Sequence, residues 1–209
     1  MDMILRPMAI EKFNIFSDSA WCFVSDSNIL VCGGGREVSS EYMKNAYNVT
    51  LSGDRGEVTT LASMHTRKSF HAIYPYRDLV YTFGGRDEYG TELTNFEEYA
   101  KSADEWSILP NLPYCIDKGT VTEKGGILYF CGLWPRYLCS YNPKNRRFDK
   151  INFILPRSKT KLLCAIPDRK ILTLITESSF ITIDSDTGAV ISEKSIELGE
   201  LEEFWSNMP

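Results

Sequence analysis

The sequence holds two histidines, His65 and His71, and these are the first residues to weigh for chemistry. Metal sites and histidine-dependent catalysis usually draw on more than two histidines, or on cysteine pairs at ligand spacing. Both histidines fall in a connection between two strand-like runs. We therefore expect hydrogen-bonded loop histidines, with neither a catalytic group nor a metal site.

Two further motifs have the outline of ligand-binding loops. The triple glycine at 33–35 lacks the Gly-Lys-Ser/Thr ending of a phosphate loop, and no helix is expected after it. The segment 184–188, Asp-Ser-Asp-Thr-Gly, begins like a calcium loop but lacks the later bidentate glutamate. Both motifs are better explained as turns, so the sequence predicts no cofactor.

The cysteines give no sign of metal binding or disulfide formation, because none is part of a C-x-x-C pair. Most of them lie in apolar, strand-like runs, which predicts reduced thiols that pack as small hydrophobic side chains. The six are Cys22, Cys32, Cys115, Cys131, Cys139 and Cys164.

Composition excludes several classes of protein. The 209 residues are 43% hydrophobic and 24% charged, which excludes a disordered chain. A net charge of −5 is not the electrostatic footprint of a nucleic-acid binder or of a protein that binds anionic membranes. No run approaches the length of a membrane span, and the N-terminus has no apolar run of signal-peptide length. We expect a cytoplasmic protein.

Strand-like runs must position all of these residues, because aromatic and β-branched side chains recur in short stretches between Gly, Asp, Asn and Ser clusters. Examples are 79–83, 127–130 and 180–183. Similar features return at intervals of about 42 to 51 residues, the period of a four-stranded repeat. The pattern predicts an all-β protein built from repeated sheets.

One repeat, residues 67–113, carries a full and ordered set of features. Arg67 opens it, an apolar run leads into Gly84-Gly85, and Tyr99 and Trp106 follow seven residues apart. This order resembles the kelch repeat, and the resemblance implies a kelch-type β-propeller of four to five blades. Other repeats keep part of the set, such as Gly33-Gly34 in the first.

The resemblance places the whole chain, 1–209, in a single propeller domain. The expected blades are approximately 16–66, 67–113, 114–156 and 157–198, with a leading strand at 8–15 and an acidic tail at 199–209. Kelch propellers commonly have six blades. The chain is therefore either a small ring, which the leading strand could complete in its last blade, or part of a larger propeller, and self-association is expected if the propeller is incomplete.

The resemblance also implies which loops could bind a partner, since the loops after strands 2 and 4 of each blade share one face. Two loops after strand 2 combine arginine with aromatic residues, the types that dominate interfaces. We expect Arg86, Tyr89, Trp134 and Arg136 to form a binding site for a protein partner, whose carboxylates could meet both arginines.

The function that follows is a non-catalytic, kelch-type interaction scaffold, by analogy of fold. An alternative is a small-molecule enzyme of oxidase, epimerase or lyase type on the same scaffold, which would need Arg86, Glu88, Arg136 and Glu177 to converge. A further alternative is a partial propeller completed by another chain.

Overall fold

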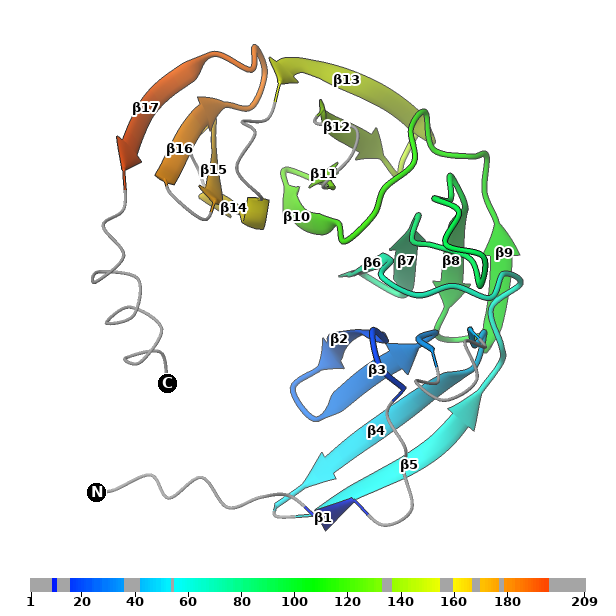
Figure 1. Ribbon diagram of the computed structural model, residues 1–209. Coiled ribbons are helices and arrows are strands. Elements are labelled where there is room, and N and C mark those ends of the chain that lie inside the picture. Colours follow the sequence, from blue (N-terminus) through cyan, green and yellow to red (C-terminus); the bar gives the residue numbers. More distant parts are fainter. Residues whose placement is uncertain are drawn as a thin grey trace. The chain divides into compact units, whose positions relative to one another are not determined.

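The described part of the protein consists of strands and loops. The computed structural model describes residues 9–10, 16–35, 42–53, 55–132, 137–154, 160–166, 170–176 and 179–195, and these ranges contain no helix. The predicted all-β class is therefore confirmed (Figure 1). The chain divides into two compact units, 1–117 and 118–209, which are described separately.

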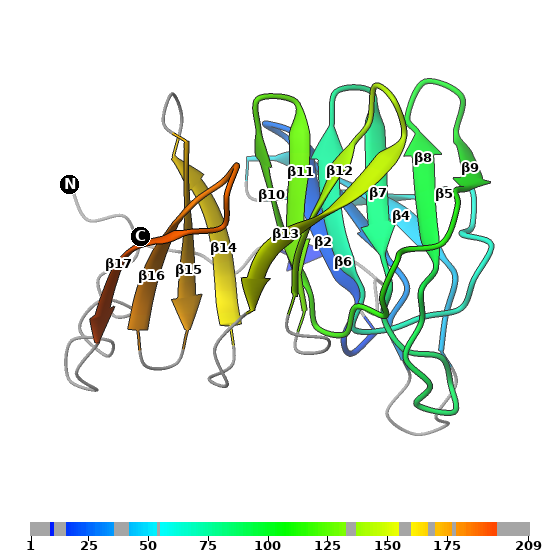
Figure 2. The ribbon, with the colours of Figure 1, turned by 90° about the horizontal axis from the view of Figure 1, so that it is seen from above.

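The first unit contains two sheets, each with four strands in an antiparallel meander in which consecutive strands are neighbours. Figure 2 shows the strands of a sheet running alternately up and down. The first sheet has the order β1-β5-β4-β3-β2 and the second β6-β7-β8-β9. Their bounds are β1 Ala9–Ile10, β2 Ala20–Ser25, β3 Asn28–Cys32, β4 Ala46–Ser52, β5 Arg55–Leu61, β6 Ala72–Tyr76, β7 Leu79–Phe83, β8 Phe96–Ala100 and β9 Glu105–Ile108.

The second unit repeats this plan in two more four-stranded meanders, β10-β11-β12-β13 and β14-β15-β16-β17. Their bounds are β10 Thr120–Lys124, β11 Ile127–Cys131, β12 Tyr137–Asn142, β13 Arg147–Ile154, β14 Thr160–Ile166, β15 Ile171–Thr176, β16 Ser179–Asp184 and β17 Val190–Ser195. Within each unit the first strands of the two sheets are in contact, β2 with β6 and β10 with β14.

The leading strand has a partner that the sequence did not reveal. Its described part, β1, pairs in parallel with β5, so that Ala9 lies opposite Arg55 and Ile10 opposite Gly56. It thus extends the outer edge of the first sheet. The interpretation in which this segment completes the last blade does not hold for the described residues.

The core of each unit lies between its two sheets, because alternate side chains of each strand point to the neighbouring sheet. In the first unit Leu30 and Cys32 pack with Val80, and the Tyr99 ring packs at a tilt against Trp106 with ring centroids 5.0 Å apart. Tyr141 and Phe148 form the equivalent pair in the second unit, at 4.7 Å. The paired aromatic positions of the repeat are thus packing positions.

The double glycine allows a close approach between backbones. Gly84 and Gly85 have positive φ angles of 59° and 100°. A Cβ on Gly84 would lie 2.3 Å from the carbonyl oxygen of Ile116, and one on Gly85 would lie 2.5 Å from that of Ser69. Only glycine fits a chain that passes this close to its neighbours.

The described cysteines are free thiols, as expected from their apolar surroundings. Cys22, Cys32, Cys131 and Cys139 are buried and Cys115 is half-buried, while the side chain of Cys164 lies outside the described residues. The segment 184–188 forms the turn between β16 and β17, where Asp184 Oδ1 accepts hydrogen bonds from the backbone N–H groups of Asp186 and Thr187. In the described ranges we find no helix with the length and apolar character to cross a membrane.

Replacing Gly84 by alanine should destabilise the fold by about 3 kcal/mol or more, because the new Cβ meets backbone atoms that cannot move aside. Gly90 is the matched control, since it also has a positive φ, 80°, but has open space around it. Gly90→Ala should cost only about 1–2 kcal/mol. Urea unfolding of both variants measures the difference, and equal losses would contradict the role given to the close approach.

Candidate functional site: a buried ion pair and the loop that precedes β8

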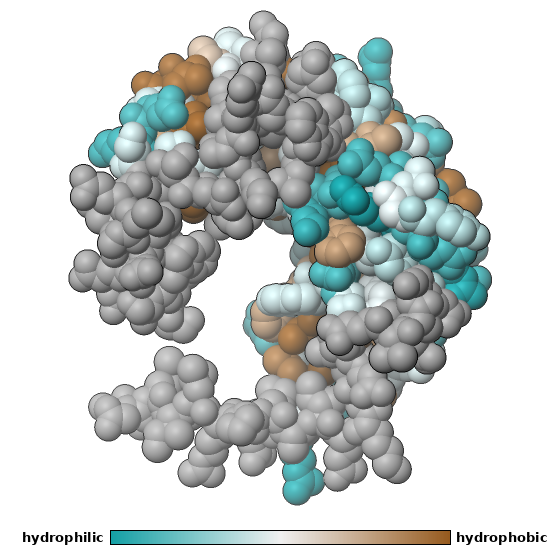
Figure 3. All heavy atoms as spheres, viewed as in Figure 1, coloured by the Kyte–Doolittle hydropathy of each residue, from teal (hydrophilic) through white to brown (hydrophobic). Residues whose placement is uncertain are grey.

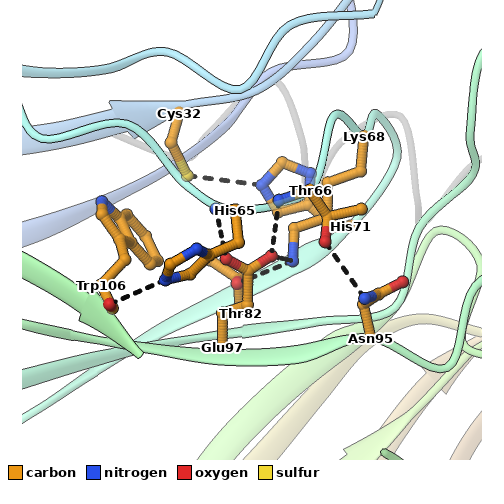
Figure 4. Close-up of polar contacts among 9 residues, drawn as sticks. All are labelled: Cys32, His65, Thr66, Lys68, His71, Thr82, Asn95, Glu97 and Trp106. Atoms are coloured by element: carbon orange, nitrogen blue, oxygen red, sulfur yellow. Dashed lines mark hydrogen bonds and ion pairs between the residues drawn. The ribbon is translucent and has the colours of Figure 1, made fainter. Parts of the chain in front are cut away.

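A lysine and a glutamate are paired in the interior of the first unit. Lys68 lies in the connection between β5 and β6, and Glu97 lies on β8; both side chains have 0% exposure. Lys68 Nζ is 3.1 Å from Glu97 Oε1 and donates a hydrogen bond of 3.0 Å to Thr82 Oγ1 (Figure 4). Burial lowers the pKa of Lys68, and the neighbouring carboxylate opposes that shift.

The Glu97 carboxylate also holds the connection itself. It accepts hydrogen bonds from the backbone N–H groups of His65, at 2.7 Å, and Thr66, at 3.3 Å. The His65 ring donates from Nε2 to the Trp106 carbonyl at 2.9 Å, and Asn95 Nδ2 donates to Thr66 Oγ1 at 3.1 Å (Figure 4). The network therefore fastens the connection between the two sheets to the second sheet.

His71 and Cys32 extend the network toward the first sheet. The Cys32 Sγ atom lies 3.4 Å from Nε2 of His71. Burial, and secondarily the charge of Lys68, lowers the pKa of His71 well below its ordinary value. Burial raises the pKa of Cys32. At neutral pH the pair is therefore a neutral imidazole beside a protonated thiol, which differs from the thiolate and imidazolium that activate a cysteine nucleophile.

The predicted site residue Arg86 is held by two carboxylates. Its Nη2 donates to Asp117 Oδ2 at 2.8 Å and to Glu92 Oε1 at 3.3 Å, and the hydrogen bond to Asp117 raises the pKa of Arg86. Asp117 is 2% exposed. Three atoms here, Arg86 Nε, Asp117 Oδ1 and Ser69 Oγ, are buried without a hydrogen-bond partner in the described structure.

Tyr89 stands at the tip of the same loop and is 85% exposed. The Asp87 carboxylate fixes the loop, because its Oδ1 accepts hydrogen bonds from the backbone N–H groups of Tyr89, at 2.9 Å, and Thr91, at 2.8 Å. Asp87 also donates its own N–H to the Thr91 carbonyl. The ring is therefore presented on an ordered turn.

The other two predicted site residues, Trp134 and Arg136, lie outside the described residues. Their expected place beside Arg86 and Tyr89 stays a prediction. Sequence reasoning did not single out Lys68, Glu97 or Asp117. No signal in the spacing could have found the pair, because Glu97 and Glu98 follow one another in the same strand and only packing distinguishes them.

Comparison with known proteins finds similarity to two curated relatives. Beta-scruin of Limulus polyphemus is 32% identical over 74 residues, and alpha-scruin of the same animal is 26% identical over 74 residues. In both cases the match spans 35% of this chain and 8% of the relative. The scruins are kelch-repeat proteins. Over these 74 residues the chain is similar to kelch-repeat proteins.

The solved structure of YjhT, a kelch-type propeller, supports the same fold. It superimposes with a TM-score of 0.63 at 11% identity, over 88% of this chain and 66% of YjhT. The kelch-type propeller predicted from the repeat is confirmed. No protein-family profile matches the chain. The chain thus matches a small part of the scruins and about two thirds of YjhT.

Replacing Lys68 by methionine should lower the free energy of unfolding by about 3–5 kcal/mol, because a buried carboxylate loses its counter-ion. Adding Glu97→Gln should recover part of that loss, since it removes the unpaired charge and its one amide oxygen still accepts from the His65 N–H group. Urea unfolding of the single and double variants measures the coupling. Lys44→Met, at an exposed lysine, is the control, and strictly additive losses would contradict the ion pair.

The buried His71 should make stability depend on pH. Below the ordinary histidine pKa of about 6.5 the unfolded chain takes up a proton that the folded state refuses, so stability is complete above that pH and falls below it. Between pH 7.5 and 5.5 the wild type should lose about 1.4 kcal/mol more than His71→Gln. Urea unfolding at both pH values tests this, and parallel losses would refute it.

Proposed function

We propose that this chain is a non-catalytic kelch scaffold that binds a protein partner through the loops after the second and fourth strands of its blades. The family supports a role in protein interaction. Within the first unit, the titratable groups of the buried network are engaged in holding the connection between sheets. The loop that precedes β8 carries an accessible aromatic side chain, Tyr89, that a partner could contact.

One observation carries the proposal, the 85% exposure of Tyr89 on a loop that is already ordered. An exposed aromatic ring gains a large apolar contact when a partner covers it. Because the Asp87 carboxylate fixes the turn, binding need not order this backbone, which lowers the entropic cost of association. Trp134 and Arg136 remain candidate contacts on the equivalent loop of the next blade.

The charges of the loop suggest the chemistry of the partner. Residues 86–92 carry three carboxylates, on Asp87, Glu88 and Glu92, against the single guanidinium of Arg86. Arg86 is already shared between Glu92 and Asp117. Figure 3 likewise shows hydrophilic side chains gathered over the second sheet. The described loop therefore favours lysine or arginine on the partner, whereas the sequence had suggested carboxylates.

A photo-crosslinking side chain at position 89 should capture one protein partner, whereas the same group at Ala103 should not. Ala103 is exposed in the turn between β8 and β9, at the opposite end of the sheet. Tyr89→Ala should weaken binding of the captured protein about 30-fold, with little effect on stability. Glu88→Lys should weaken it too.

Two results would contradict the proposed face. One is the capture of the same protein from positions 89 and 103. The other is unchanged affinity of the Tyr89→Ala variant in a direct titration. Urea unfolding of each variant is the control, because a loss of binding that follows a loss of stability says nothing about the surface.

A further inference from the structure

A cavity of about 350 Å³ opens in the first unit, between the first sheet and the end of β8. It lies away from the loop of Tyr89, because Lys101 follows β8 whereas that loop precedes β8, and Ser25 and Asn28 lie at the β2–β3 hairpin. Its size is at the lower end of the range for sites that bind small molecules. The lining residues are Val24, Ser25, Asn28, Leu30, Asn48, Thr59, Leu61, Tyr99 and Lys101.

One wall of the cavity belongs to a ladder of polar side chains across neighbouring strands. Asn48 Nδ2 donates to Asn28 Oδ1 at 3.2 Å and to Thr50 Oγ1 at 3.0 Å, and the Thr50 hydroxyl donates to Asn28 Oδ1 at 2.8 Å. Asn28 Nδ2 in turn donates to Ser25 Oγ at 2.9 Å. These bonds orient the amides and leave Asn48 Oδ1 available as an acceptor among the described residues.

Four of the lining residues, Val24, Leu30, Leu61 and Tyr99, are apolar or aromatic. Leu30 belongs to the buried core of the first unit, and Val24 and Leu61 are half-buried beside it. The Tyr99 ring packs on Trp106, and its hydroxyl donates to Asp104 Oδ1 at 2.8 Å, so the ring cannot swing freely. The cavity therefore offers apolar side chains beside oriented hydrogen-bonding groups, a combination found in small-molecule sites.

Lys101 gives the cavity a positive charge. Its Nζ donates to the Arg77 carbonyl at 2.5 Å and forms no ion pair with the described carboxylates. Burial raises the pKa of the Cys22 thiol to about 12, and the positive charge of Lys101 opposes this rise. An ammonium group with spare donors and no counter-ion is suited to bind an anion.

We propose that this cavity binds a small hydroxylated carboxylate, with its carboxylate on Lys101, its hydroxyls on Asn48 and Thr59, and its carbon chain against Tyr99 and Leu30. The charge selects an acid, and the oriented amide and hydroxyl groups select hydroxyls along its chain. A six-carbon hydroxy acid is a reasonable match for the volume. This site is independent of the proposed protein partner.

Titration of the ¹⁵N-labelled full chain with gluconate tests the proposal by NMR. We expect saturable shifts of the side-chain amides of Asn28 and Asn48, with affinity near the millimolar range. Acetate, which has the carboxylate alone, and sorbitol, which has the hydroxyls alone, should each bind about tenfold more weakly. Gluconate thus needs both of its features.

Lys101→Gln should weaken gluconate binding about tenfold or more, because it removes the charge that meets the carboxylate. Lys44→Gln removes a charge at an exposed lysine outside the cavity and should leave binding unchanged. Thr59→Val, at an exposed side chain, provides a second test with little risk to folding. This substitution should weaken the binding of gluconate without affecting the binding of acetate.

Three outcomes would overturn the proposal. These are no saturable shift with gluconate, equal binding of acetate and gluconate, or equal losses in Lys101→Gln and Lys44→Gln. The amide spectrum of each variant shows whether it is folded, so a failure to bind can be assigned to the cavity. Loss of partner binding through Tyr89 would leave these results unaffected.

Discussion

The segment that leaves each sheet of the first unit runs directly over a glycine pair, and backbone hydrogen bonds hold it there. Gly34 donates its N–H to the Lys68 carbonyl at 3.0 Å, and Gly85 donates to the Ile116 carbonyl at 2.6 Å. The same carbonyls are the atoms that a Cβ on Gly33 or Gly84 would strike. Because the glycines let the two backbones come this close, the side chain of Lys68 enters the space between the two sheets at a fixed point.

At Lys68 that fixed point explains the buried ion pair. A lysine that enters the interior needs a counter-charge and acceptors, which Glu97 and Thr82 supply from two adjacent strands. The carboxylate then has capacity left for the N–H groups of His65 and Thr66. An apolar pair could fill the same volume, but it could not satisfy those backbone donors. The pair thus links sheet packing to the course of the connection.

The same backbone hydrogen bonds allow the side chain at an equivalent loop position to differ between the two sheets. Gly35 bridges Ser17 and Tyr42 in the first sheet, and Arg86 bridges Ser69 and Glu92 at the equivalent place in the second. Because backbone hydrogen bonds set these bridges, the side chain can change without changing the path of the chain. The position after the glycine pair is therefore Gly35 in the first sheet. In the second sheet it is Arg86, which lies in the same loop as the exposed Tyr89 and is paired with Glu92 and Asp117.

By itself the sequence determined the strands, the repeat, the glycine pair, the aromatic pairs Tyr99–Trp106 and Tyr141–Phe148, and the turn at 184–188. These are local features, because periodicity, backbone conformation and turn chemistry depend on residues near in sequence. Only the tertiary structure decided the pairing of Lys68 with Glu97, the engagement of Arg86 by Asp117, and the pairing of β1 with β5. Burial and the choice of a partner for a charge depend on which segments the packed sheets bring together, and no spacing along the chain records that.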